Sequence, residues 1–311
     1  MSPMPKVRIV TDSSAHFFDP DFPTRHNVTV LPLNIEFGAQ SQPDTPDLSA
    51  EQLFQRVAAG APVPTAQAPS ARQFAAVYED ICRTNDTILS IHLSSKLSRT
   101  VANARLGAEE VLGRCKIHVI DSLSTSIGLG LLVEAAALAA ERGDSQDDIV
   151  RIVRGMIPRL YAVYFIETME YLAKASRIGK AQAVLGSMLG IKPFLTLEDG
   201  DIVPMEKVRT RQQAVEKLVE FVVEFSNIEH LAILQNSITH SDDTRLLLER
   251  LAVEFPGRTW PVLTYGPALA TFLGPNAMGV VVHEGEDEPE TPLASSARQM
   301  DEDPKPRKSK G

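Results

Sequence analysis

The amino-acid sequence predicts an α/β protein with a Rossmann-like N-terminal domain, mostly a parallel sheet, and a second α+β domain with a mixed sheet. Short, nearly continuous apolar runs alternate with longer helical patterns in the first half, as parallel strands covered on both faces require. The pattern changes beyond residue 158, where two strands are separated by a tight turn. A length of 311 residues also suits two domains better than a single core.

The first domain is expected over residues 1–158. Apolar runs of the parallel-strand type lie at 7–10, 88–93 and 117–120, and a further one lies just beyond the boundary, at 162–166. Helices are predicted to begin after three serines, which are favourable N-caps: Ser70, Ser98 and Ser145. The most apolar helix, at 127–140, contains Glu134 and is too short to span a bilayer, so a buried core helix is expected and stable membrane insertion is not.

The second domain is expected over residues 159–283. Two short helices at 169–175 and 180–188 precede paired strands at 191–197 and 202–208, with Asp199-Gly200 as the turn. Helices are then predicted at 211–225 and 242–255, and strands at 231–235, 260–264 and 279–282. Residues 284–311 are rich in Pro, Glu, Asp, Lys and Ser, and this segment is predicted to be disordered because it has too little apolar surface to offset chain entropy.

Composition narrows the possible partners and compartments. The net charge of −9 argues against a nucleic-acid partner, because phosphate binding requires clustered Lys and Arg. The first residues lack the basic and apolar regions of a signal peptide, so a soluble, cytoplasmic protein is expected. Cys82 and Cys115 lie in or beside apolar runs without CxxC spacing, and we interpret them as buried free thiols rather than a disulfide.

Common enzyme motifs are missing from the sequence. It has no GxxxxGK[ST], HExxH or GxSxG segment, and no cofactor is predicted. The seven histidines are scattered, with none two or four residues from another, so no metal site is expected. Gly128 and Gly130 fall inside a predicted helix, which indicates close helix packing rather than a phosphate loop.

Hydroxyl-rich turns follow three of the predicted strands. They contain Thr11-Asp12-Ser13-Ser14, then Ser94-Ser95 with Ser98-Arg99-Thr100, then Asp121-Ser122 with Ser124-Thr125-Ser126, and Thr65 lies in a further proline-bracketed loop. Helix capping explains any one of them, but three turns at one sheet edge favour an anion site, because ligands bind beyond the carboxyl ends of parallel strands. Hydroxyls without a base suit binding rather than nucleophilic attack. His92 is interpreted as a packed core histidine rather than a catalytic base.

Seven segments, in order, resemble the DegV family of fatty-acid-binding proteins, which serve as carrier subunits of bacterial fatty acid kinase. They are IVTDSSA, VLPLNIEFG, PTAQAPS, IHLSSKLSRTVANA, VIDSLSTSIGLGLLVEAA, the block that begins ETMEYLAKASRIGKAQ, and GPALATFLGPNAMGVVV. The resemblance covers residues 7–282. It implies two α/β domains, with an acyl chain in a tunnel of the first and its carboxylate at the domain junction.

The resemblance also implies a set of site residues. The head-group contacts fall on Thr65 and on Ser94 or Ser95, and Arg177 is the surface arginine that a kinase partner would contact. The full set of expected ligand-binding residues is Asp12, Ser13, Thr65, Ser94, Ser95, Ser98, Arg99, Phe272 and Gly274.

The sequence departs from the family pattern at four places. Ala66 replaces a serine, Arg99 replaces a glycine, Ala175-Ser176 replaces a pair of glycines, and Phe272 stands where the family has a histidine. The expected function is a non-catalytic long-chain fatty-acid-binding protein that presents its lipid to a fatty acid kinase. The alternatives are a lipid sensor or reservoir without kinase coupling, a serine esterase or phosphatase using Ser95 with His92, and a structural protein with empty clefts.

Overall fold

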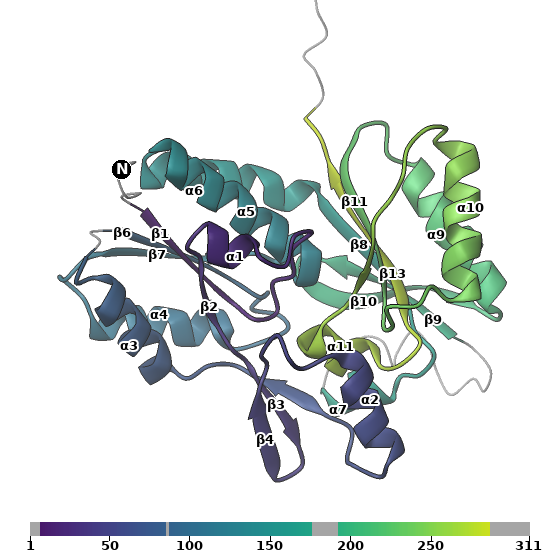
Figure 1. Cartoon of the computed structure of the whole chain (residues 1–311), viewed down its shortest axis with the longest axis horizontal. Helices are drawn as coiled ribbons and strands as arrows, with labels where there is room; N and C mark the ends of the chain where they lie inside the picture. The colour runs from purple at the N-terminus through teal and green to yellow at the C-terminus, as the bar shows by residue number, and fades with distance from the viewer. Residues whose placement is uncertain (1–6, 85–86, 176–191, 287–311) are drawn as a thin grey trace, which may run out of the picture.

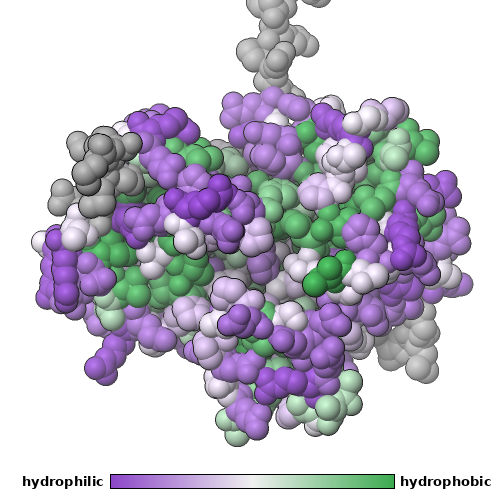
Figure 2. All heavy atoms as spheres, viewed as in Figure 1, coloured by the Kyte–Doolittle hydropathy of each residue, from purple (hydrophilic) through white to green (hydrophobic). Residues whose placement is uncertain are grey.

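The computed structural model of the chain describes residues 7–84, 87–175 and 192–286. It is an α/β structure with three sheets: a parallel four-stranded sheet, a mixed six-stranded sheet and a small antiparallel sheet of three strands (Figure 1). Hydrophobic residues gather in two areas of this face, over the four-stranded and the six-stranded sheets, and hydrophilic residues surround them (Figure 2). Within the described ranges, no helix combines the length and apolar character that crossing a bilayer requires.

The four-stranded sheet has the order β2-β1-β6-β7 and is parallel throughout. Its strands are β1 (Val7–Asp12), β2 (Thr29–Leu31), β6 (Thr87–His92) and β7 (Lys116–Asp121). Helices α3 (Ala71–Ile81) and α4 (Thr100–Glu110) cover one face, and α5 (Ser126–Arg142) and α6 (Gln146–Met156) cover the other. The short helix α1 (Phe22–Arg25) links β1 to β2. Burial on both faces explains why these strands read as continuous apolar runs.

The small sheet has the order β4-β3-β5 and was not expected from the sequence. It consists of β3 (Asn34–Phe37), β4 (Gln40–Pro43) and β5 (Thr65–Gln67), with α2 (Ala50–Ala58) between β4 and β5. The sequences QSQP and TAQ carry no run of apolar residues, so neither strand pattern is visible before the partners are known.

The six-stranded sheet has the order β10-β9-β8-β13-β11-β12. Its strands are β8 (Leu160–Phe165), β9 (Lys192–Glu198), β10 (Asp201–Val208), β11 (Ile228–Gln235), β12 (Val262–Thr264) and β13 (Met278–Glu284), and the connecting elements are η1 (Ile157–Arg159), α7 (Glu170–Lys174), α9 (Arg211–Val223), α10 (Asp242–Glu254) and α11 (Pro267–Leu273). The sheet is mixed, because only β11 and β12 run parallel. The expectation that the run at 162–166 forms a parallel strand is wrong: β8 is antiparallel to both neighbours. The β8 sequence is continuously apolar because both faces of the strand are buried, one in the core cluster around α5 and the other in the cluster that contains α9.

Helix α5 lies between the two larger sheets. It packs against β1 and β6 on one side and β8 and β13 on the other, and residues of both sheets share one hydrophobic cluster around it. Inside the helix, a Cβ atom on Gly130 would lie 1.7 Å from the carbonyl oxygen of His16, so only glycine fits. The close packing predicted for this glycine pair is confirmed. The division of the chain at residue 158 stays a prediction.

Several local predictions are confirmed. Ser70 and Ser145 are N-caps that accept hydrogen bonds from Gln73 and Asp148 backbone N–H groups. Asp199 and Gly200 both have positive φ, 48° and 80°, as a tight hairpin turn requires. The helix expected to begin after Ser98 instead has Arg99 at its N-cap. The helix expected at 180–188 lies outside the described residues, as does the expected tail beyond residue 286.

The two cysteines correct a prediction. Cys82 and Cys115 form a disulfide, with Cα atoms 5.7 Å apart, so the interpretation as free thiols is wrong. Cys82 follows the end of α3, and Cys115 immediately precedes β7. The packing of α3 against α4 brings these two positions together, and sequence spacing did not reveal that packing.

Candidate functional site

The three hydroxyl-rich turns lie side by side at the carboxyl edge of the parallel sheet. Backbone hydrogen bonds join them: the Ser94 N–H donates to the Ser124 carbonyl at 3.0 Å, and the Ser126 N–H donates to the Ser14 carbonyl at 2.9 Å. The parallel order of β1, β6 and β7 produces this convergence, as the sequence predicted.

Asp12 is fully buried and all its bonds are internal. Its Oδ1 accepts from the backbone and hydroxyl of Ser14, and its Oδ2 accepts from His92 Nδ1 at 2.9 Å and Leu93 N–H at 3.0 Å. The other ring nitrogen of His92, Nε2, lies 2.6 Å from the Ser90 hydroxyl. Asp12 therefore fixes the end of β1 to the end of β6. His92 is a satisfied core histidine and has no nitrogen left to activate Ser95.

Ser13 joins this edge to the small sheet. Its hydroxyl donates to Asp44 Oδ2 at 2.9 Å and accepts from the Leu33 N–H at 2.9 Å. The pKa of the Asp44 carboxyl is raised to about 7, chiefly by burial; the bond from Ser13 lowers it, and the nearby Asp12 raises it to a smaller extent. Ser13 thus holds a buried, readily protonated carboxyl group rather than an open binding position.

The adjacent residues Ser94 and Ser95 have different environments. The Ser94 hydroxyl is fully buried and donates to the Gly200 carbonyl at 2.6 Å, across to the β9–β10 turn. Ser95 is exposed; its N–H donates to Asp121 Oδ1 at 3.1 Å, and its hydroxyl has no hydrogen bond within the described residues. Of the two serines, Ser95 has the available hydroxyl.

At the start of α4, Ser98 makes internal hydrogen bonds, whereas the next residue, Arg99, is exposed. The Ser98 hydroxyl lies 2.8 Å from Thr100 Oγ1 and accepts from the Thr100 N–H. Arg99 is exposed and makes no capping bond. The Arg99 side chain therefore extends from the helix start into solvent.

The loop that leads into α5 is strained. Leu123 and Ser126 both have positive φ, 49° and 52°, which non-glycine residues rarely adopt. Between them, Thr125 is 2% exposed, and its buried hydroxyl has no hydrogen-bond partner in the part of the chain that the structure describes. The sequence showed this turn as one more hydroxyl cluster, and neither the strain nor the unpartnered hydroxyl of Thr125 was predicted.

Thr65 lies in β5, where α11 packs against it. Its side chain is half-buried and has no hydrogen bond in the described part of the chain. Phe272, on α11, is 5% exposed and belongs to the core cluster around α5. Gly274 ends α11 with a φ of 73°, and a Cβ there would lie 2.7 Å from the ring of Tyr171. The region around α11 is largely apolar, and Thr65 is the predicted ligand-binding residue there that carries a hydroxyl. Arg177 lies outside the described residues.

One cavity of about 680 Å³ opens between β4 and α2. Its lining residues are Gln42, Pro43, Thr45, Asp47, Leu48, Gln52, Gln55, Arg56 and Ala59. None of the predicted ligand-binding residues lines this cavity. Among the described residues, a possible metal-binding group consists of Glu229, His230 and His283, at the opposite end of β13 from α11.

Comparisons with known proteins cover almost the whole described chain. The sequence model of the family described as "Uncharacterised protein, DegV family" matches residues 6–285. A DegV domain-containing protein of Streptomyces coelicolor is 33% identical over 278 residues, which are 89% of this chain and 98% of that protein. A solved structure described as fatty acid binding of a DegV family protein from Thermus thermophilus has a TM-score of 0.79 at 29% identity, covering 89% of this chain and 99% of that one. Bacillus subtilis DegV, described as a fatty acid binding protein, shares the fold with a TM-score of 0.78 at 24% identity, covering 89% and 99%. The chain belongs to the DegV family.

Proposed function

We propose that this protein binds a long-chain fatty acid, with the carboxylate at the carboxyl edge of the parallel sheet and the acyl chain buried in the protein. The observation that carries the proposal is the similarity, over 89% of this chain, to the Thermus thermophilus protein whose structure is described as fatty acid binding. The seven family segments lie along the same stretch of chain.

The available hydroxyl groups support a carboxylate site. A carboxylate that leaves water must gain several donors, and most hydroxyls at this edge already serve internal bonds. Ser95 and Thr65 are the predicted ligand-binding residues whose hydroxyls remain without partners among the described residues. An acyl chain of about fourteen methylenes would contribute roughly 11 kcal/mol of gross burial energy, which exceeds the lower estimates of association cost, about 4 kcal/mol.

The arrangement favours holding a lipid over transforming it. A serine nucleophile requires an adjacent base, and both nitrogens of His92 are engaged below the surface by Asp12 and Ser90. We therefore infer a carrier that presents its fatty acid to an acyl kinase, with Arg177 as a partner contact. A sensor or reservoir is the second candidate, and Phe272, an apolar residue at the position where the family has a histidine, favours it.

The first test is direct. Untagged protein purified from a heterologous host should release a fatty acid on organic extraction, identified by mass spectrometry, and added fatty acid should raise its melting temperature. Release of no acyl chain, together with no thermal shift, would contradict the proposal.

The second test locates the head group. Thr65→Val and Ser95→Ala should each weaken fatty-acid binding by about 1–2 kcal/mol, the scale of one hydrogen bond to a charged group. Thr65→Ser, which keeps the hydroxyl, should bind normally. Ser226→Ala, in the exposed loop before β11, is the matched control. Unchanged affinity in both Thr65→Val and Ser95→Ala would mean that the carboxylate lies elsewhere.

A further inference from the structure

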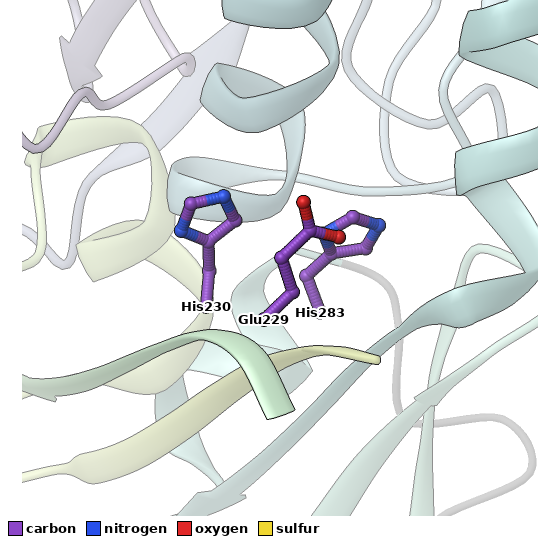
Figure 3. Close-up of side chains that lie close together, drawn as sticks. All are labelled: Glu229, His230 and His283. Atoms are coloured by element: carbon purple, nitrogen blue, oxygen red, sulfur yellow. The ribbon is translucent and has the colours of Figure 1, made fainter. Parts of the chain in front are cut away.

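Three potential metal ligands lie together at one end of the six-stranded sheet. Glu229, His230 and His283 each offer a ligand atom, and these atoms all lie within 4.8 Å of one another. Figure 3 shows the three side chains projecting to the same side of their strands, with the carboxylate beside the ring of His283. The two imidazole rings are nearly parallel, with centroids 5.8 Å apart.

A β-bulge creates this arrangement. His230 and His283 are direct partners across β11 and β13, whereas the next aligned pair is Ile228 with Glu284, so Glu229 is an extra residue in β11. Successive side chains of a regular strand point to opposite faces, which would separate Glu229 from His230. The bulge removes that alternation and re-aims the carboxylate toward the histidine pair.

His283 is an unusual member of the group because its ring nitrogens are buried without a hydrogen bond among the described residues. The residue is 2% exposed, and within the described ranges neither ring nitrogen makes a hydrogen bond. Nδ1 lies 3.2 Å from Glu229 Oε2, but the two groups are not aligned for a hydrogen bond. A buried imidazole with two unsatisfied nitrogens is costly, and coordination of one nitrogen to a cation would offset that cost.

The charges around the group are compatible with a bound cation. Arg159 is the nearby positive charge, and it is paired with Glu286 at 3.0 Å. Glu229 and His230 are exposed, so their side chains can move the short distance that a shared ion requires.

We propose that Glu229, His230 and His283 form a binding site for Zn²⁺ or a similar divalent transition ion, with water completing the coordination. Two imidazoles and one carboxylate are a ligand set that zinc accepts, with His nitrogens at about 2.0–2.1 Å. Mg²⁺ and Ca²⁺ prefer oxygen ligands and are not expected to bind here. The site lies at the opposite end of β13 from α11, so the proposal does not depend on fatty-acid binding.

The test uses the full, untagged chain after dialysis against a chelator. Zn²⁺ titrated in competition with a chromophoric chelator should bind with one site per chain, and Co²⁺ should give the visible absorption of a protein-bound ion. Glu229→Gln and His230→Ala should each weaken Zn²⁺ binding by at least about tenfold. Both residues are exposed, so neither change disturbs the core.

His240→Ala is the matched control, because His240 is also exposed and lies in the loop before α10. It should leave Zn²⁺ affinity unchanged, and Mg²⁺ should not compete. The proposal is overturned if Zn²⁺ shows no saturable binding, or if binding survives both Glu229→Gln and His230→Ala at full affinity. A loss in His240→Ala equal to that in His230→Ala would also overturn it.

Discussion

Replacing Ser94 with alanine separates a structural hydroxyl from a ligand-binding one. The Ser94 hydroxyl donates to the buried Gly200 carbonyl at 2.6 Å and accepts from the Lys96 N–H at 3.2 Å. Alanine removes both bonds. Lys96 is exposed, so its N–H can be hydrated by water. The Gly200 carbonyl, in contrast, would be left buried and unpaired.

The cost of leaving the buried Gly200 carbonyl unpaired determines how much stability Ser94→Ala should lose. The free energy of unfolding should fall by about 1–3 kcal/mol in Ser94→Ala, the cost of one unsatisfied buried group. Ser95→Ala should leave stability within about 0.5 kcal/mol, as exposed substitutions usually do, while weakening fatty-acid binding. Ser94→Ala is thus expected to lower stability, whereas Ser95→Ala is expected to lower fatty-acid affinity.

Urea unfolding followed by circular dichroism gives the stabilities, and fatty-acid titration gives the affinities. A double-mutant cycle adds a check, because a Cβ at Gly200 would lie 2.3 Å from the Ser94 hydroxyl oxygen. Gly200→Ala should therefore cost less in the Ser94→Ala background than in the parent. Full stability in Ser94→Ala, or additive costs in the cycle, would refute the assignment of Ser94 to the β9–β10 contact.

The remaining predictions concern the buried acid, the disulfide and the family departures. Burial raises the pKa of Asp44 from its ordinary value of 3.8 to about 7. The protonated carboxyl therefore contributes its full stabilisation below pH 3.8, and this stabilisation is lost as the pH rises through 7. Asp44→Asn should therefore raise the melting temperature more at pH 8 than at pH 5, and an equal gain at both would contradict the burial argument. The Cys82–Cys115 disulfide spans 33 residues, so reduction should lower the free energy of unfolding by about 3–5 kcal/mol by loop entropy; an unchanged urea midpoint under reductant would contradict this. Phe272→His should raise ATP consumption by a fatty acid kinase at saturating fatty acid, while Arg99→Gly, an exposed position, should change it little; collapse in Arg99→Gly would show that Arg99 contacts the head group.

Local sequence signals predicted much of the fold. Capping serines such as Ser70 and Ser145, the Asp199-Gly200 turn and long apolar runs each depend on a few neighbouring residues. The strands of the small sheet could not be predicted in this way. Strand β4, for example, is polar and mostly exposed, and only its pairing with β3 makes it a strand.

The convergence of the three hydroxyl-rich turns at one sheet edge was predictable from the sequence, but the hydrogen bonds of the individual residues were not. The strand order places the three turns at one edge, yet nothing in the dipeptide Ser94-Ser95 indicates which hydroxyl is free. That depends on the β9–β10 turn, which lies far along the chain. The pair His230 and His283 was missed for a similar reason, since cross-strand pairing and a bulge create the group and no sequence spacing records either.

The position of α5 has a consequence for ligand exchange. Because the helix packs against both larger sheets, which share one hydrophobic core cluster around it, hinge motion between the sheets would break that core. Away from α5, helix α11 packs against β5 and α7, and these three elements are short: β5, α7 and α11 have three, five and seven residues. Local opening of these short elements needs far less free energy than separation of the sheets. Under the proposed function, fatty-acid release should therefore occur on that side, and its rate should respond to packing changes around Phe272 rather than to changes along α5.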